Sequence, residues 1–215
     1  MNLGIFGGTF DPIHNGHLGI AEEAASRVAL DEVWFIPTGQ PWLKAGRIIS
    51  PSRHRIAMVH LALEMHSFKV SSIEVDRPGP SYTVDTLVAL TEGASKEDSL
   101  FFILGMDSLA DLHRWHQPQR LFELCTLVAV SRPEYSSINV AHHLNPMLPT
   151  PGSFDASRAP NTSSQIVIVD GPSIEISGAE IRQRVAQDLP ITHWVPEKVE
   201  KYIYQHGLYR EAGVE

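Results

Sequence analysis

The stretch Met1-Asn-Leu-Gly-Ile-Phe-Gly-Gly-Thr-Phe-Asp-Pro-Ile-His-Asn-Gly-His17 decides the fold. It holds a short apolar run, turns at the pair Gly7-Gly8, and leads into residues 18–28, where apolar side chains recur at helical spacing. This pattern predicts a strand, a glycine turn and a helix, an arrangement that brings backbone N–H groups up to a phosphate. His14 and His17 stand where the helix begins, spaced so that both imidazoles can face one ligand. The segment therefore predicts a nucleotide site with two histidines in it.

Composition limits the classes of partner. The chain has 215 residues, a net charge of −8, and hydrophobic and charged fractions of 43% and 20%, which are ordinary for a globular protein. The negative charge argues against a broad nucleic-acid-binding surface, so no nucleic-acid partner is expected. The N-terminus lacks the pattern of a signal peptide, and no apolar run approaches the ~20 residues of a membrane helix. We therefore expect a cytoplasmic protein without membrane contact.

The lone cysteine and the alternation of elements narrow the fold. Cys125 excludes a disulfide framework or a cysteine-based zinc site within one chain. Most predicted strands are apolar on both faces, which favours an α/β fold with a doubly wound parallel sheet and helices on both faces. The predicted strands are 3–6, 33–37, 68–75, 100–104, 126–130 and 165–169. The predicted helices are 18–28, 52–63 with Ser52 as N-cap, 81–90, 109–115, 118–125, 177–186 and 196–206.

The predicted sheet has two consequences. Ligands bind beyond the carboxyl ends of the strands in such sheets, and the candidate residues follow Phe6, Ile36, Leu104 and Val169. Residues 132–164 are rich in proline and serine and show little periodicity. We therefore expect a single domain spanning residues 1–215, with an irregular surface excursion at about 132–164.

Physical chemistry alone leaves the opening motif open to several interpretations. It is not a Walker loop, because no Gly-Lys-Ser/Thr follows, and it lacks the Gly-x-Gly-x-x-Gly spacing of dinucleotide sites. The glycines could form an ordinary turn and the histidines could be surface residues. A metal pair is a third alternative, although no further ligand set is obvious nearby.

Motifs along most of the chain supply a more specific interpretation. The opening run resembles the His-x-Gly-His signature of nucleotidyltransferases and, more narrowly, the Gly-Gly-Thr-Phe-Asp-Pro-x-His-x-Gly-His run of bacterial nicotinate-nucleotide adenylyltransferases. Further marks of the narrower family are Pro37–Lys44, Gly79-Pro-Ser-Tyr-Thr-Val-Asp-Thr86, Phe101-Phe-Ile-Leu-Gly-Met-Asp107, Trp115, Ile176-Ser-Gly-Ala-Glu-Ile-Arg182, and the ending from Val195-Pro to Gly207-Leu-Tyr209. Residues 134–164 carry no such mark.

The resemblance implies a Rossmann-like fold and a reaction. Members of that family transfer AMP from ATP to nicotinate mononucleotide, giving nicotinate adenine dinucleotide and pyrophosphate in NAD biosynthesis. The attacking phosphate oxygen is already ionised near neutral pH, so no general base is needed. The protein must align two anions and neutralise the developing charge. Mg²⁺ is expected to bridge phosphate oxygens and to be held mainly by the substrate.

By the same resemblance, particular residues take particular roles. His14, His17 and Arg182 would stabilise the transition state. The ATP-binding residues would be Gly8, Thr9, Phe10, His14, His17, Lys44, Gly105, Asp107, Ser177 and Arg182. The mononucleotide-binding residues would be Thr9, Phe10, Thr83 and Trp115, with Trp115 stacked on the pyridine ring and Thr83 near the carboxylate. Without the resemblance, Trp115 is an ordinary core aromatic and Thr83 a helix N-cap.

The chain departs from the family pattern at a few positions. Leu43 stands where a histidine is usual, and His116 where tyrosine is common. Met106 replaces alanine, which we expect to alter the volume of the pocket. Gly178-Ala179 replace two hydroxyl residues inside a predicted capping box, Ser177 to Glu180. These departures bear on affinity and selectivity more than on the chemistry of the two histidines.

Rival functions remain at this point. A sister enzyme would prefer nicotinamide mononucleotide, and a nucleotide-binding regulatory protein would have lost catalysis. A metal-dependent hydrolase is a weaker third, since no third protein ligand is apparent. The sequence is compatible with a homo-oligomer but does not specify one.

Overall fold

The computed structural model describes residues 1–42, 48–93, 95, 97–131, 166–172, 174 and 176–210. Leu43, Lys44 and the expected excursion at 132–164 therefore lie outside the described residues. The strands are β1 (Asn2–Gly8), β2 (Glu32–Pro37), β3 (Lys69–Val70), β4 (Ser99–Gly105), β5 (Thr126–Val130) and β6 (Ile166–Val169). They form one sheet in the order β3-β2-β1-β4-β5-β6, and every neighbouring pair is parallel.

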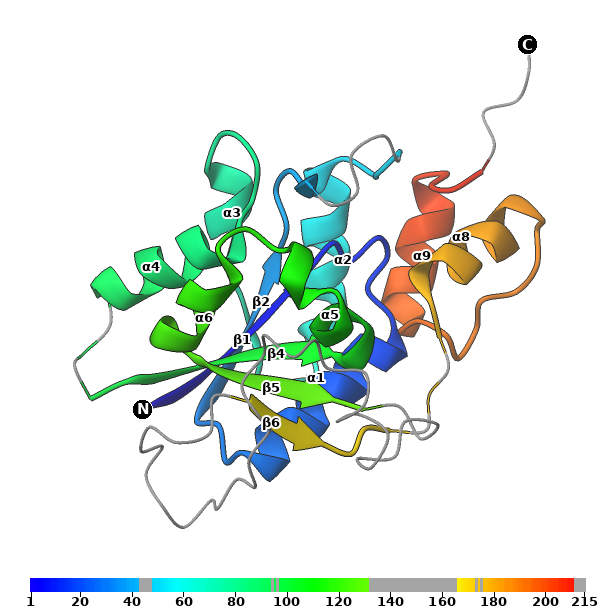
Figure 1. Cartoon of the computed structure of the whole chain (residues 1–215). Helices are drawn as coiled ribbons and strands as arrows, with labels where there is room; N and C mark the ends of the chain where they lie inside the picture. Colours follow the sequence, from blue (N-terminus) through cyan, green and yellow to red (C-terminus); the bar gives the residue numbers. More distant parts are fainter. Residues whose placement is uncertain are drawn as a thin grey trace.

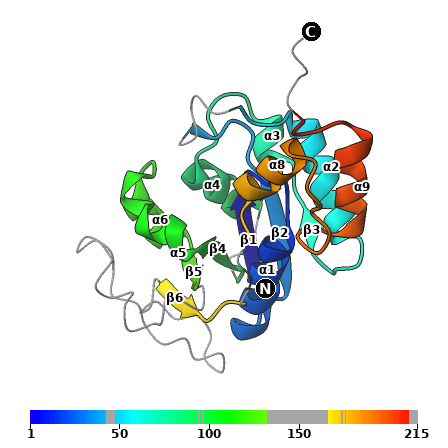
Figure 2. The ribbon, with the colours of Figure 1, turned by 90° about the vertical axis from the view of Figure 1, so that its right-hand side faces the viewer.

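Helices cover both faces of this sheet (Figure 1). They are α1 (Asn15–Arg27), α2 (Ser52–Leu63), α3 (Ile73–Asp76), α4 (Thr83–Gly93), α5 (Met106–Ala110), the 3₁₀ helix η2 (Leu112–Arg114), α6 (Pro118–Leu124), α8 (Gly178–Ala186) and α9 (Glu197–Gln205). Figure 2 shows α4, α5 and α6 on one side of the sheet and α1, α2 and α9 on the other. The predicted doubly wound parallel α/β fold is confirmed.

The strands are apolar on both faces because each face has its own core. Along β4, Phe101 and Ile103 pack with the α1, α2 and α9 side, whereas Leu100, Phe102 and Leu104 pack with the α4, α5 and α6 side. Successive side chains of a strand point to opposite faces, so a continuous apolar run fills both layers. No helix in the described ranges is long and apolar enough to cross a membrane.

The structure corrects two expected boundaries. The strand expected at 68–75 is only β3, which pairs with β2 alone, and the chain then turns into α3. Serine hydroxyls favour this turn, because the Ser72 Oγ donates to the Asp76 carboxylate at 2.6 Å and competes with strand pairing. The helix expected at 109–115 is divided into α5 and η2.

Two helix caps differ from the expected ones. Pro51, not Ser52, is the N-cap of α2, and Ser52 is its first helical residue. Thr83 likewise opens α4 instead of capping it. The end of α9 behaves as expected, since Gly207 follows it with a φ of +58°, a conformation that favours glycine.

Strand order positions the site. The chain builds β1, β2 and β3 outward in one direction and then returns to the other side of β1 with β4. The order therefore reverses between β1 and β4, and a crevice opens there beyond the carboxyl ends of the two strands. β1 ends at Gly8 and β4 ends at Gly105. The candidate residues that follow these two strands therefore lie at the same crevice.

Candidate active site

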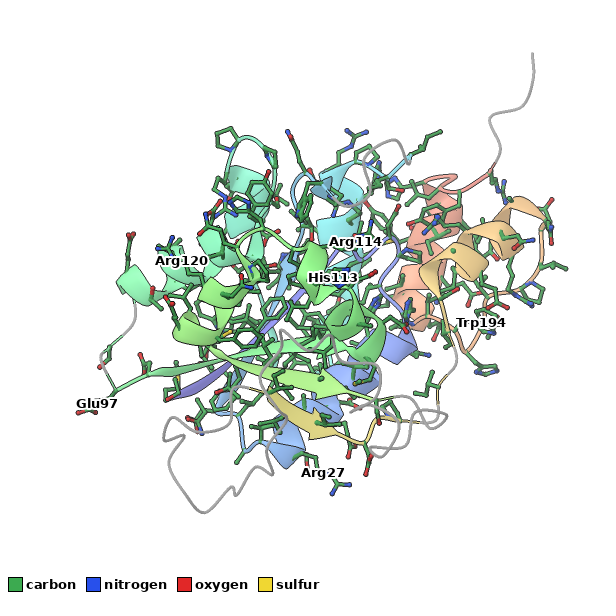
Figure 3. The ribbon with its side chains drawn as sticks, in the orientation of Figure 1. Arg27, Glu97, His113, Arg114, Arg120 and Trp194 are labelled. Carbon is green, nitrogen blue, oxygen red and sulfur yellow. The ribbon has the colours of Figure 1, made fainter. Side chains whose placement is uncertain are left out.

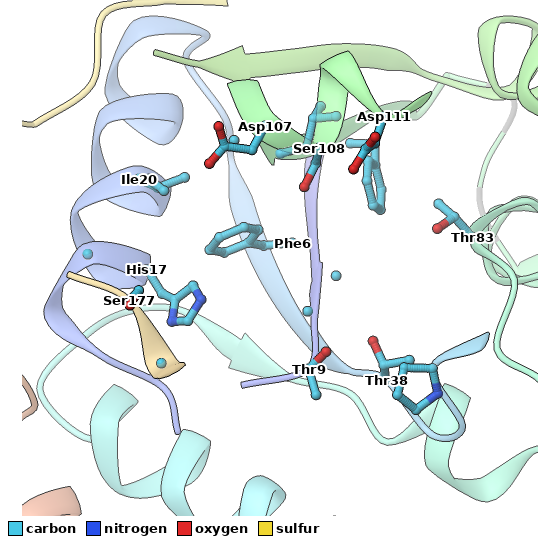
Figure 4. A pocket seen from close by; sticks show the side chains of 18 of the residues that line it. Phe6, Thr9, His17, Ile20, Thr38, Thr83, Asp107, Ser108, Asp111 and Ser177 are labelled. Atoms are coloured by element: carbon cyan, nitrogen blue, oxygen red, sulfur yellow. The ribbon is translucent and has the colours of Figure 1, made fainter. Parts of the chain in front are cut away.

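A cleft of about 640 Å³ occupies this switch point. Its walls come from the ends of β1, β2 and β4, from the start of α1, and from the segments before α4, after α5 and before α8. Figure 4 shows Asp107, Ser108 and Asp111 on one wall, and Thr9 and Thr38 opposite them. The predicted residues that line the cleft are Gly8, Thr9, His14, His17, Thr83, Gly105, Asp107, Trp115 and Ser177.

The turn after β1 is shaped by Phe10. This residue has a φ of +47°, and its ring is 1% exposed, packed against Phe6 and His17 at centroid distances of 5.6 and 5.1 Å. A Cβ on Gly8 would lie 2.8 Å from the Phe10 ring, so glycine is required there. The Phe10 side chain is part of the core, and any contact of this residue with a ligand falls to its backbone.

The two histidines are held by the helix start itself. His14 is the N-cap of α1, and its backbone N–H donates to Nδ1 of His17 at 3.2 Å. The two rings stack with centroids 3.6 Å apart and planes at 21°. Because Nδ1 of His17 accepts, its Nε2 carries the hydrogen in the neutral ring and is a donor. Figure 4 shows the His17 ring beside Ser177 at the edge of the cleft. The two imidazoles thus lie side by side and both residues line the cleft, while their contact with one ligand stays a prediction.

The start of α1 is also tied to a distant segment. The Asn15 backbone N–H donates to the carbonyl of Trp194 at 2.9 Å, and Asn15 Nδ2 donates to the carbonyl of His193 at 2.7 Å. The Arg184 guanidinium lies 4.7 Å from the centre of the Trp194 ring. Figure 3 shows Trp194 on the side of the fold that carries the C-terminal helices. The histidine-bearing helix start is therefore attached to the C-terminal part of the fold.

Arg182 holds the loop after β1 and is not among the residues that line the cleft. Its Nη1 donates to the backbone carbonyl of Asp11 at 2.6 Å. The Asp11 carboxylate accepts from the Tyr209 hydroxyl at 2.7 Å and from the Ser50 backbone N–H at 3.2 Å. Burial and the Asp11 carboxylate raise the pKa of the Tyr209 hydroxyl. Sequence reasoning missed Tyr209 in this role, because a partner 198 residues away leaves no local signal.

The capping box correctly predicted the start of α8, and this helix start lies at the cleft. Ser177 is the N-cap, and its Oγ accepts from the Glu180 backbone N–H at 3.2 Å. Ser177 and Gly178 both line the cleft. A Cβ on Gly178 would lie 3.2 Å from the Asp11 carbonyl oxygen, a tight contact. Glycine at this departure therefore lets α8 begin close against the loop after β1.

The opposite wall carries the aromatic residues. Trp115 lines the cleft and meets Phe102 edge-on, with centroids 5.9 Å apart and planes at 85°. His116, the departure from tyrosine, stacks on Tyr82 at 4.2 Å beside Thr83. Met106 belongs to the same core cluster as Leu104 and Leu109 and is not among the residues that line the cleft. Its effect on the volume of the pocket stays a prediction.

Glu74 is a lining residue that the sequence analysis did not identify. It is 6% exposed and accepts from Thr86 Oγ1 at 2.8 Å, while Arg77 Nη2 donates to the same hydroxyl at 2.8 Å. Burial raises the pKa of the Glu74 carboxyl, against the opposing effects of Thr86, Arg77 and Ser81. The sequence did not reveal Glu74 because its pattern predicts a strand at 68–75. In the structure Glu74 lies on α3 and lines the cleft.

The comparisons with known proteins agree with the geometry. The family model described as cytidylyltransferase-like matches residues 5–184. A probable nicotinate-nucleotide adenylyltransferase from Roseiflexus sp. (strain RS-1) is 45% identical over 97% of this chain and 98% of its own length. One of the same name from Thermomicrobium roseum is 44% identical over 97% of this chain and 91% of its own length.

Solved structures show the same fold. The Plasmodium falciparum nicotinic acid mononucleotide adenylyltransferase complexed with NaAD superposes with a TM-score of 0.74 at 17% identity, covering 97% of both chains. The same enzyme complexed with APC gives a TM-score of 0.72. From its parallel sheet, its paired histidines at the switch point and these whole-length relatives, we conclude that the chain belongs to the cytidylyltransferase-like family and, within it, to the nicotinate-nucleotide adenylyltransferases.

Proposed function

We propose that this chain transfers AMP from ATP to the 5′-phosphate of nicotinate mononucleotide and releases pyrophosphate. The observation that carries this proposal is the placement of His14 and His17 in the same cleft as Trp115 and Thr83. One wall offers imidazole and helix-start donors to phosphates, and the other offers a flat aromatic face and a hydroxyl to a pyridine. The cleft also includes Gly105 and Asp107 at the end of β4, where we place the adenosine.

Phosphate alignment is the main task of the protein. The second pKa of a phosphate monoester is about 6, so the nucleophile needs no general base near neutral pH. We assign to Nε2–H of His17 a hydrogen bond to the reacting phosphate, because Nδ1 is already occupied by the N–H of His14. The start of α8, with Ser177 and its backbone N–H groups, would receive the pyrophosphate portion. These donors stabilise the charge that develops on phosphorus and on the leaving group.

The roles expected for Arg182 and Lys44 have a different basis from those of the cleft-lining residues. The contact of Arg182 with the Asp11 carbonyl indicates that Arg182 acts on the loop after β1, and a direct contact with phosphate would require it to move. Lys44 lies outside the described residues, and its contact with phosphate stays a prediction. The Thr9 and Phe10 backbone would lie between the two substrates.

We propose that Mg²⁺ enters with ATP. The described residues contain no group of three or more His, Cys, Asp or Glu side chains that could hold a metal ion. Phosphate oxygens would supply its ligands, and when bound it would neutralise phosphate charge. We place the reaction in the cytoplasm, without nucleic acid or membrane, and leave the formation of a homo-oligomer to measurement.

One assay tests the proposal. The protein is incubated with Mg-ATP and either nicotinate or nicotinamide mononucleotide, and pyrophosphate is measured. Release with the acid in clear preference to the amide is expected. Release only with the amide would assign the sister activity, and no release with either would reject catalysis in favour of a nucleotide-binding protein.

A further inference from the structure

Arg55 is a buried cation beneath the floor of the cleft. It lies on α2, is 2% exposed, and is not among the lining residues. Its Nη1 donates to the carbonyl of Thr9 at 2.8 Å and its Nη2 to the carbonyl of Gly39 at 3.3 Å. Its Nε donates to the carbonyl of Ser50 at 2.9 Å. One guanidinium therefore joins the turn after β1, the turn after β2 and the segment before α2.

Burying the charged guanidinium of Arg55 only to fill space in the core would be energetically unfavourable. Burial removes the guanidinium from water, which lowers the pKa of Arg55, and the nearby carboxylates of Asp11 and Glu74 only oppose that effect. Removing an ion from water costs several kcal/mol, and apolar side chains of similar size often serve stability equally well. A buried arginine at this place is thus better explained by the orientation that its planar fork imposes on the carbonyls.

Peptide geometry shows what that orientation does. In a trans peptide the C=O and the following N–H point in opposite directions. The Gly39–Gln40 peptide follows this rule: its carbonyl accepts from Arg55, and the Gln40 N–H on the other side donates to Ser81 Oγ at 3.1 Å. In the Thr9–Phe10 peptide the carbonyl also accepts from Arg55, so the Phe10 N–H points away from the guanidinium.

The backbone N–H of Phe10 lies next to the cleft-lining residue Thr9. Within the described part of the chain, no hydrogen bond takes up this N–H group. Thr9 lines the cleft, and the Phe10 ring is fixed in the core below it. The positive charge on the carbonyl side of this peptide polarises it and makes its N–H a stronger donor.

We propose that Arg55 is a positioning residue for phosphate binding. It turns the Thr9–Phe10 peptide so that the Phe10 N–H is presented to a substrate phosphate, and it sets the spacing between the turns after β1 and β2. The inference rests on the proposed function only in taking the anion to be a phosphate of ATP or of the mononucleotide. A pyrophosphate assay of the wild-type protein tests that function separately.

The first experiment uses the unaltered protein and NMR. Mg-ATP and nicotinate mononucleotide are titrated separately, and the backbone amide signals are followed. The Phe10 amide proton is expected to move downfield with at least one of them, because the N–H gains a charged acceptor. If neither substrate moves this signal while pyrophosphate release is normal, the inference is overturned and the proposed function stands.

The second experiment uses Arg55→Lys, which keeps the charge but loses the planar fork. We expect kcat/KM to fall by about tenfold to a hundredfold, and the downfield shift of the Phe10 amide to shrink, in a protein whose circular dichroism is unchanged. The matched control is Arg53→Lys, an exposed arginine on the same helix, which should behave as wild type. A folded Arg55→Lys variant with wild-type kcat/KM and a wild-type amide shift would refute the role. If that variant does not fold, the titration of the unaltered protein still decides.

Discussion

The backbone N–H of His14 lies 3.2 Å from Nδ1 of His17, so the cap of a helix also selects the tautomer of a candidate catalytic ring. The same contact satisfies an N-terminal donor of α1 and makes Nε2 the nitrogen that carries the hydrogen in the neutral His17 ring.

His17→Ala tests this donor. We expect kcat to fall by about 10²–10³-fold, the range for losing one donor to a developing oxyanion, while the cap contact accounts for only about 1 kcal/mol of stability. Steady-state kinetics and a thermal melt measure the two effects. His113→Ala, an exposed histidine on η2, is the control. A turnover near that of wild type would reject the assigned role.

Trp115 should act on one substrate and not on the other. Stacking of an aromatic side chain on a base contributes about 1–3 kcal/mol, so Trp115→Ala should raise the KM for the mononucleotide about tenfold or more. The KM for ATP should change little, and Trp115→Phe should recover most of the loss. Trp194→Phe, outside the cleft lining, serves as control. Equal increases in both KM values would contradict the assignment to the pyridine.

Gly8→Ala tests the packing of the turn after β1. The added methyl group would lie 2.8 Å from the Phe10 ring, which is itself packed in the core. We expect a loss of about 1–3 kcal/mol in the free energy of unfolding, together with a large loss of activity. Gly93→Ala, at the end of α4 with nothing within 4 Å of the new atom, should be neutral or slightly stabilising. Denaturant titrations of both variants measure the contrast, and similar effects at the two positions would disprove it.

Glu74 should make stability depend on pH. Its pKa in the folded protein is raised by burial above the ordinary 4.5, so the folded state binds more protons than the unfolded state between the two values. Stability from this group is therefore present below pH 4.5 and is lost as the pH rises through the folded pKa. We expect the difference in unfolding free energy, wild type minus Glu74→Gln, to decrease over that window.

Urea titrations at several pH values measure this difference. Glu92→Gln, an exposed residue on α4, provides the control. A flat or rising difference for Glu74→Gln would mean that the carboxyl is not held in the desolvated environment described above.

Local patterns predicted the fold and one half of the site. The Gly7-Gly8 turn, the helix start at His14 and the capping box at Ser177 are encoded in short stretches, and parallel strands bring such stretches to one edge of a sheet. Each of these patterns lies within a few consecutive residues. It can therefore be recognised from the sequence without knowing which residues lie across the cleft.

Residues that act through long-range contacts could not be predicted in the same way. Arg55 looks like any charged residue at the start of a helix, yet its three acceptors come from three separate segments. Glu74 was assigned to a strand because apolar and polar residues alternate both before and after Ser71-Ser72, although the apolar positions shift by one there and α3 follows. Only the folded chain shows that these two ionisable groups lie beneath and beside the cleft.

The bond between Tyr209 and Asp11 has a consequence for biosynthesis. Asp11 is translated before its partner Tyr209, which is added 198 residues later. Arg182, which grips the same loop, also follows every strand of the sheet. A nascent chain that has completed β6 thus holds both histidines but lacks the contacts that order the loop before them. The turn that carries the two histidines is therefore translated before the residues that hold it in place.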